Sequence, residues 1–283
     1  MVSISPLRKD TVPTMKIYQN GISAYMGGSG DHARAPRGVV RGWSTASVRR
    51  HRQWAWSIDH NELQGHGYAV TLTMERTPDT AAEFVKLRTA WLMRIERMSA
   101  LRTHWVVEWQ ERGTPHIHAA VYFEDALTPQ QQAMLVGHWV SITAPAFGAL
   151  IWAQDVKRID GSLGWLKYLA KHATRGMQHY QRQGHPEGWE KTGQLWGRRG
   201  EWPEHEPMVL DQLNVHEFWR MRRIARAWAV ADARKRGEWK RLHYLRSAGR
   251  PNNARESRFM GVAEWLPEDV LLRLVDLFER ENR

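Results

Sequence analysis

The chain of 283 residues contains no cysteine, so it can form neither a disulfide framework nor a thiolate site for zinc. Any metal ion must therefore be held by histidine, carboxylate or amide groups. Long apolar runs are also missing, because no stretch approaches the roughly 20 residues that a membrane-spanning helix needs. The N-terminal region lacks the apolar segment of a secretion signal. These absences predict a soluble cytoplasmic protein that binds no membrane.

Positive charge is what the chain has in excess. It carries 41 Lys and Arg residues against 30 Asp and Glu residues, a formal net charge of +11. Such a balance favours a polyanionic partner, with nucleic acid as the first candidate. Basic residues scattered over a surface that binds nothing would give the same number, so charge alone leaves both interpretations open. The content of 42% hydrophobic residues predicts a folded protein with a core.

Composition divides the chain into three parts. Residues 1–46 mix glycine and proline with little periodicity and are expected to form a flexible tail. Residues 47–206 carry regular hydrophobic patterns, and residues 207–283 are basic, rich in tryptophan and helical in pattern. Two basic clusters next to tryptophans are candidates for contacts with DNA. Their residues are Arg49, Arg50 and Arg52 in the first cluster and Arg222, Arg223, Arg226, Arg234, Lys235 and Arg236 in the second.

The first of these clusters has an equally good alternative interpretation. It is followed by Trp54 and Trp56, which could stack on bases. The same pattern is also expected of a solvated turn that leads into a strand of the core.

Hydrophobic periodicity predicts the order β-α-β-β-α-β in the central part. The expected elements are a strand at Tyr68–Met74, a helix at Asp79–Met98, strands at His104–Gln110 and Pro115–Phe123, a helix from Thr128 to about Thr143 and a strand at Leu150–Val156. This order is typical of the split βαβ, or ferredoxin-like, fold, in which an antiparallel sheet carries helices on one face. The predicted fold class is therefore α+β, with a basic helical extension at the C-terminus. The fold by itself indicates no function.

The strand Pro115–Phe123 contains two histidines, His116 and His118, that are two residues apart and so project from one face. A hairpin that turns at residues 111–114 pairs positions whose numbers sum to about 225, which brings Glu108 opposite this pair. Two imidazoles and a carboxylate on one face suit a divalent ion, and we favour Mg²⁺ or Mn²⁺. Alternatively, Glu108 is an edge-strand carboxylate that pairs with Arg112.

A second candidate group follows on a helix that is expected to begin near Ser162. Tyr168 and Lys171 are three residues apart and share a helical face, which places a cation beside a potential nucleophile. In isolation the pattern favours a different interpretation, a half-buried helix tyrosine next to a surface lysine.

The ordered set of motifs resembles the rolling-circle replication initiators of plasmids and single-stranded DNA phages, which belong to the HUH endonuclease superfamily. Three motifs carry the resemblance: Val70-Thr71-Leu72-Thr73, Glu108 followed by His116-Ile117-His118, and Tyr168-Leu169-Ala170-Lys171. The segment Gly197-Arg198-Arg199-Gly200 also resembles one that recurs downstream of the nucleophile helix. The resemblance spans roughly residues 47 to 205.

The resemblance implies that Tyr168 attacks a phosphodiester in single-stranded or hairpin origin DNA, leaving a 5′-phosphotyrosine and a 3′-hydroxyl for the host polymerase. It further implies that Glu108, His116 and His118 hold the metal ion and that Lys171 offsets negative charge. Position 172 is histidine, so a single-tyrosine enzyme is expected. The chain lacks the pattern Gly-x-x-x-x-Gly-Lys-Ser/Thr of a nucleotide-driven motor, which implies a separate host helicase.

Two other functions fit parts of the same pattern. One is a single-tyrosine transposase or a relaxase of the same superfamily, although in a relaxase the nucleophile usually precedes the histidines. The other is a non-catalytic module that binds nucleic acid on its sheet, as RNA-recognition domains do, although their aromatic motif is missing.

Overall fold

The computed structural model describes residues 13–26, 42–160, 180–189, 191–210, 213–247 and 263–281. The chain forms two compact units. The large unit comprises Pro36–Ala55 and Asp59–Pro203, and the small unit comprises Met1–Ala35, Trp56–Ile58 and Glu204–Arg283. Composition predicts a boundary at residue 207; the units divide at Glu204, and the small unit also takes in the N-terminal residues.

The large unit is built on a five-stranded sheet with the order β6-β3-β5-β4-β7, in which the neighbouring strands are antiparallel. Its strands are β3 (His66–Leu72), β4 (Arg102–Trp109), β5 (Pro115–Phe123), β6 (Asp155–Arg158) and β7 (Trp196–Gly200). Two helices connect them, α2 (Ala81–Arg97) between β3 and β4 and α3 (Pro129–Phe147) between β5 and β6. The protein is thus α+β, with antiparallel sheets and helices.

The predicted helices form because their first turns are capped. The side chain of Thr80 accepts a hydrogen bond from the Glu83 amide at the start of α2. At the start of α3, Thr128 and Gln131 form a reciprocal capping box, and Pro129 occupies the first turn. The expected start of this helix is confirmed.

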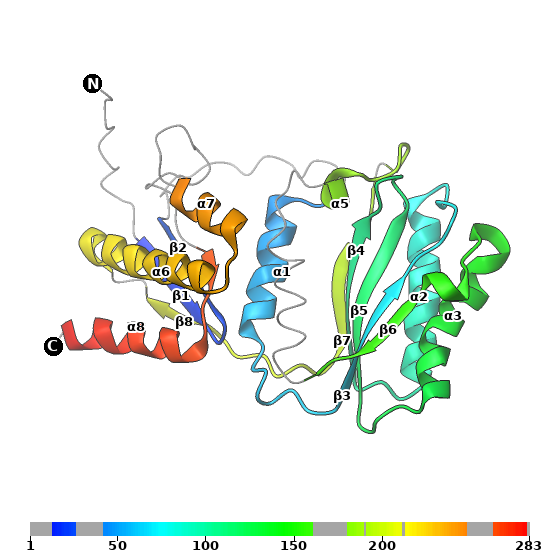
Figure 1. Ribbon diagram of the computed structural model, residues 1–283, viewed down its shortest axis with the longest axis horizontal. Helices are drawn as coiled ribbons and strands as arrows, with labels where there is room; N and C mark the ends of the chain where they lie inside the picture. Colours follow the sequence, from blue (N-terminus) through cyan, green and yellow to red (C-terminus); the bar gives the residue numbers. More distant parts are fainter. Residues whose placement is uncertain are drawn as a thin grey trace. The chain divides into compact units, whose positions relative to one another are not determined.

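Helices α2 and α3 cover one face of the sheet (Figure 1). Alternate strand residues such as Leu72, Val107 and Ile117 are fully buried against them. The indole N–H of Trp91 donates to the carbonyl of Leu135, and that of Trp139 donates to the carbonyl of Thr73. These two tryptophans therefore fill the core without leaving their polar atoms unsatisfied.

The strand expected at Leu150–Val156 is wrong in its first half. Residues Ile151–Ala153 form a short 3₁₀ helix, and β6 begins only at Asp155. The side chain of Gln154 explains the difference, because it accepts a hydrogen bond from the Thr73 amide and donates one to the carbonyl of Leu150. These bonds stabilise a turn where the apolar residues alone predicted a strand.

The other face of the sheet meets α1 (Thr45–Ser57) and lies near α5 (Tyr180–Gln183). His51 of α1 lies 3.0 Å from His104 of β4, measured between their Nε2 atoms. The expectation that α1 would be a turn leading into a strand is wrong, since these residues form a helix of 13 residues.

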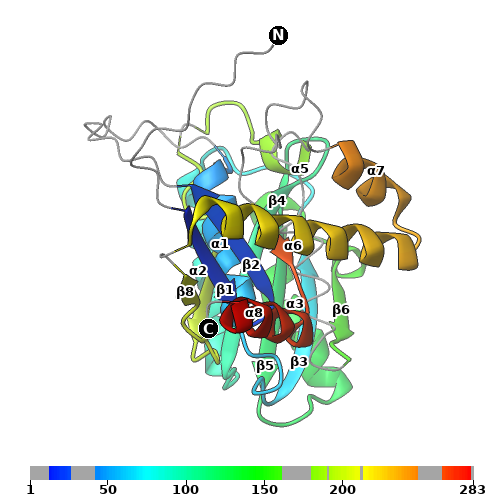
Figure 2. The same ribbon diagram turned by 90° about the vertical axis from the view of Figure 1, so that its left-hand side faces the viewer.

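The small unit has a four-stranded sheet with the order β8-β1-β2-β9. Its strands are β1 (Pro13–Tyr18), β2 (Gly21–Met26), β8 (Met208–Leu210) and β9 (Ala263–Trp265), and its helices are α6 (Val215–Lys235), α7 (Trp239–Ser247) and α8 (Glu268–Glu281). Figure 2 shows α6 and α8 on the same side of the β1–β2 hairpin. Their contact buries Ile22, Phe218 and Leu271.

The flexible tail predicted for residues 1–46 is therefore wrong for residues 13–26. They form an antiparallel hairpin in which Tyr18 pairs with Gly21. Asn20, in the turn, donates a hydrogen bond to the carbonyl of Ile58 at 2.6 Å. The helix expected to begin near Ser162 lies outside the described residues. Within the described part of the chain, no helix is both long and apolar enough to cross a membrane.

Candidate metal centre

Strands β4 and β5 bring together the three residues that the sequence singled out as metal ligands. Glu108 pairs directly with His116, and Val106 pairs with His118, so both imidazoles and the carboxylate lie on the sheet face opposite to α2 and α3. Oε2 of Glu108 lies 4.0 Å from Nε2 of His116 and 3.6 Å from Nε2 of His118. The imidazole rings are nearly perpendicular, with centroids 4.4 Å apart.

The donor set fits a divalent cation. Two ligand atoms about 2.1 Å from one ion are at most about 4.2 Å apart, and both measured separations fall within that limit. Ligand atoms of all three residues lie within 4.8 Å of one another. Glu108 is fully buried, whereas the side chains of His116 and His118 are 11% and 14% exposed. An ion held here would therefore have the carboxylate beneath it and remain accessible past the imidazoles.

Thr71 of β3 gives the motif Val70-Thr71-Leu72-Thr73 a physical role. Its Oγ1 lies 3.3 Å from Nδ1 of His118, across the β3–β5 pairing in which the two residues face each other. In the tautomer in which Nδ1–H donates to the hydroxyl, the lone pair of Nε2 is available to a cation. Sequence reasoning did not assign this contact, although the position of Thr71 in the motif was the available signal.

The alternative role for Glu108, an edge-strand carboxylate paired with Arg112, does not fit the structure. Strand β4 lies between β5 and β7 and is not an edge. The guanidinium of Arg112 instead donates to the carbonyl of Met74 at 2.6 Å and to Oγ1 of Thr114 at 3.1 Å.

Tyr168 and Lys171, the expected nucleophile and its cation, lie outside the described residues. Three tyrosines of the large unit belong to described elements: Tyr68 of β3, Tyr122 of β5 and Tyr180, the first residue of α5. Tyr68 is buried on the helix-covered face, where its hydroxyl accepts a hydrogen bond from the Leu127 amide. Tyr122 is buried on the other face, and burial raises the pKa of its phenol despite the nearby Arg102. Neither Tyr68 nor Tyr122 has the environment of an activated nucleophile.

The basic residues expected to contact DNA have different environments. In the first cluster, Arg49 and Arg50 are exposed on α1 and Arg52 is half-buried. In the second, Arg223, Arg234 and Lys235 are exposed on α6, while Arg236, also exposed, pairs with Asp232 at 2.8 Å.

Two arginines of the second cluster have contacts inside the small unit. Arg222 is buried with its guanidinium over the ring of Trp219, and Arg226 donates to the carbonyl of Leu245. Trp54, proposed to stack on bases, is also buried, within an aromatic cluster of the large unit that includes His104 and Trp196.

The segment Gly197-Arg198-Arg199-Gly200, for which the sequence offered no mechanism, forms most of β7. A Cβ on Gly197 would overlap the indole of Trp105, its pairing partner on β4. A Cβ on Gly200 would overlap the carbonyl of Leu101, and Gly200 has a φ of +73°. The glycines thus allow β7 to lie closely against β4, the strand that carries Glu108.

Comparison with known proteins identifies the family. The replication-associated protein ORF2 family matches residues 67–177, a range that includes Glu108, both histidines and Tyr168. The chain is 38% identical over 270 residues to a putative replication protein of Xylella fastidiosa strain 9a5c, covering 92% of this chain and 94% of that one. The chain belongs to this family.

Two further relatives support the same membership. A replication-associated protein of Pseudomonas phage Pf3 is 38% identical over 251 residues, covering 86% of this chain and 88% of the phage protein. A putative replication protein of Xylella fastidiosa strain Temecula1 is 37% identical over 263 residues, covering 90% of this chain and 99% of that one. Because these matches cover most of the chain, the family relationship extends over both units. No solved structure matches the chain.

Proposed function

We propose that this replication-associated protein initiates rolling-circle replication by nicking and rejoining origin DNA through Tyr168. The observation that carries the proposal is the convergence of Glu108, His116 and His118 on one sheet face, at distances that one divalent ion can span. Mg²⁺ or Mn²⁺ suits this donor set, and the imidazoles favour Mn²⁺. When bound, such an ion polarises a phosphate oxygen and offsets the charge of the transition state.

In the proposed reaction one phosphoester bond forms and another breaks. The phenol oxygen of Tyr168 attacks the phosphorus and loses its proton, and the bond from phosphorus to the 3′ oxygen breaks. That oxygen takes up a proton and leaves as a 3′-hydroxyl, while the 5′ end stays on the enzyme as a phosphotyrosine. Lys171 offsets the negative charge on the attacking oxygen. Attack by a 3′-hydroxyl on the phosphotyrosine reverses the reaction and joins the ends.

Two structural observations support this assignment. The first is the sheet order β6-β3-β5-β4, which supports the split βαβ fold implied by the resemblance. The second is the environment of Tyr68 and Tyr122, which makes both poor nucleophiles and removes two alternatives to Tyr168. Single-stranded or hairpin origin DNA is then the substrate, and a host helicase and polymerase act on the nicked product.

The decisive experiment looks for the covalent intermediate. Purified full-length protein with Mn²⁺ or Mg²⁺ is incubated with labelled single-stranded oligonucleotides that tile the replicon encoding the chain, and the products are separated on a denaturing protein gel. Wild type and Tyr25→Phe, a change at an exposed tyrosine of the small unit, should give a labelled protein band. Tyr168→Phe should give none.

Other results would point to other functions. If wild type binds the oligonucleotides but forms no adduct with either metal ion, the nicking function is refuted and a binding module is favoured. If the protein excises and joins the ends of a mobile element instead of nicking an origin, the same chemistry serves transposition.

A further inference from the structure

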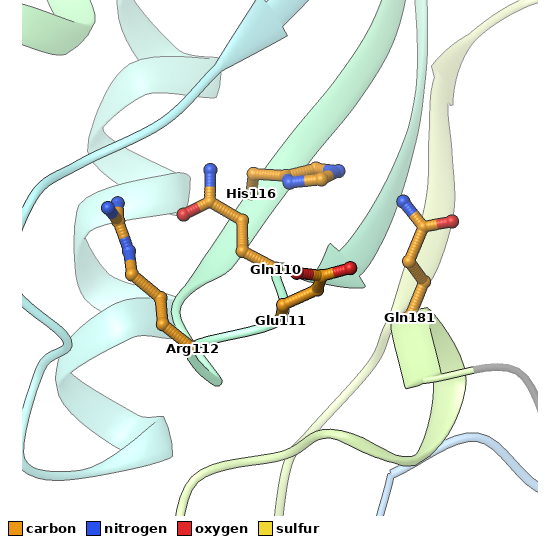
Figure 3. Close-up of a pocket in the computed structure, with 5 residues that line it drawn as sticks. All are labelled: Gln110, Glu111, Arg112, His116 and Gln181. Carbon is orange, nitrogen blue, oxygen red and sulfur yellow. The ribbon is translucent and has the colours of Figure 1, made fainter.

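An open pocket of about 460 Å³ adjoins the metal centre in the large unit. It lies between the turn that connects β4 to β5 and the short helix α5, and Figure 3 shows its five lining side chains. These are Gln110, Glu111, Arg112, His116 and Gln181. His116 belongs both to this pocket and to the candidate ligand set. A group bound in the pocket is therefore the immediate neighbour of a group bound at the metal centre.

Hydrogen bonds to the connection between β3 and α2 fix two of the lining side chains that come from the β4–β5 turn. The amide nitrogen of Gln110 donates to Oγ1 of Thr73 at 2.7 Å. Arg112 is fixed by the carbonyl of Met74 and by Thr114, whose hydroxyl in turn lies 2.8 Å from that of Thr77. Two of the five lining side chains are thus oriented before any ligand arrives, as a recognition site requires.

The lining groups are chemically suited to the edge of a nucleobase. They comprise two primary amides, one carboxylate, one guanidinium and one imidazole, so they offer hydrogen-bond donors and acceptors beside the apolar stems of the same side chains. Glu111 is exposed, and in Figure 3 its carboxylate points away from the turn, toward the side on which Gln181 stands. A carboxylate in this position repels a phosphate but accepts a hydrogen bond from an amino group.

Gln110 does not compete with Glu111 as an acceptor, because its carbonyl oxygen is shielded from solvent. The Glu111 carboxylate is therefore the acceptor that a ligand in the pocket meets, and it favours a ligand that carries an N–H donor.

We propose that this pocket binds the base of a nucleotide adjacent to the phosphate at the metal centre and selects a base with an exocyclic amino group. The inference rests on the nicking function proposed above. Adenine, cytosine and guanine carry such a group and thymine does not, so thymine is the base that the pocket accepts least well. Glu111 is then a specificity-determining residue, and it takes no part in the chemical step.

The test measures nicking of a set of single-stranded oligonucleotides in which each position on either side of the mapped nick is changed in turn to A, C, G and T. At one position, thymine should lower kcat/KM about tenfold or more in the wild-type protein. Glu111→Gln should reduce that difference to less than about twofold, because an amide can donate to the carbonyl of thymine as well as accept. Glu124→Gln, at an exposed carboxylate next to the opposite end of β5, should keep the wild-type preference.

The possible outcomes separate the two proposals. If wild type nicks DNA but shows no base preference next to the nick, or if Glu111→Gln keeps the preference against thymine, the pocket is no base subsite and the nicking function stands. If Glu111 had only a structural role, its replacement would lower the rate equally for all four bases, which also overturns the inference. Absence of any adduct with wild type overturns the nicking function first and the subsite with it.

Discussion

Replacing Glu108 by glutamine tests the metal centre directly, because the amide keeps the shape of the side chain and removes its charge. Glu108 is fully buried and lies 3.6 Å and 4.0 Å from the two imidazole nitrogens. The substitution should therefore leave the packing of β4 intact and abolish the anionic ligand that sits beneath the ion. We expect the wild-type protein and Glu108→Gln to unfold at similar temperatures without metal. Mn²⁺ should raise the unfolding temperature of the wild type more than that of the variant.

The size of the difference follows from mass action. An ion present at 100 times its dissociation constant stabilises the folded state by about 2.7 kcal/mol. Removing a hydrogen-bond partner of a metal ligand already weakens binding by about 10–100-fold, so removing the ligand Glu108 should weaken it by about 100-fold or more. At the same Mn²⁺ concentration the variant then gains only about 0.4 kcal/mol. For a unit of this size, the missing 2.3 kcal/mol or so corresponds to about 5–9 °C in unfolding temperature.

Differential scanning calorimetry with and without Mn²⁺ measures this shift. The two compact units can unfold in separate transitions, so the comparison uses the transition that moves with metal in the wild-type protein. The matched control is Glu124→Gln, which alters an exposed carboxylate and should keep the full shift. The ligand assignment is refuted if Glu108→Gln responds to Mn²⁺ as strongly as wild type does. If the wild-type protein responds to neither Mn²⁺ nor Mg²⁺, the residues form no metal centre.

Two further predictions concern the glycine segment and the basic helix. Gly197→Ala should destabilise the large unit by about 1–3 kcal/mol, because its Cβ would overlap the Trp105 indole. Thermal unfolding measures this, and the control Gly137→Ala on α3 should be neutral or stabilising. An unchanged unfolding temperature for Gly197→Ala would contradict the prediction. Replacing Arg223 and Arg234 together by glutamine should weaken DNA binding and lower the slope of log K against log salt by about 0.7–0.9 for each phosphate that is no longer neutralised. Arg273→Gln, also exposed in the small unit, should leave the slope unchanged, and an equal slope in all three proteins would exclude α6 from the DNA interface.

The part of the site that the sequence predicted correctly depends on local chain geometry. The register that places Glu108 opposite His116 is confirmed, because the two strands are joined by a short turn that leaves little freedom in their pairing. The contacts that the sequence missed join residues far apart in the chain. Thr71 reaches His118 across β3 and β5, and His51 reaches His104 from a helix that precedes the whole sheet. Periodicity within a window contains no information about such pairs.

Errors at single elements have equally specific causes. The apolar run at Leu150–Trp152 predicted a strand, but the amide of Gln154 closes a turn there and all three side chains are exposed. The basic cluster before Trp54 predicted either a DNA contact or a turn. These residues lie on one side of a helix, and its opposite side buries His51 against the sheet. The helix was missed because a segment with so many charges has only a weak apolar stripe.

The largest error, the flexible tail, shows what prediction by separate segments cannot recover. Each strand of this hairpin contributes only two residues to the core that it shares with the helices, Met15 and Ile17 from β1 and Ile22 and Ala24 from β2, and a lone hairpin is at best marginally stable. Its stability comes from β8, β9 and the helices α6 and α8, which follow more than 180 residues later in the chain.

The N-terminal and C-terminal segments are therefore one folding unit, and truncation at either end would expose the apolar face of the other. A deletion after residue 207 would thus report loss of folding together with any loss of DNA binding. The roles of Arg223 and Arg234 therefore have to be separated from stability by substitutions on the exposed side of α6, which leave both segments in place.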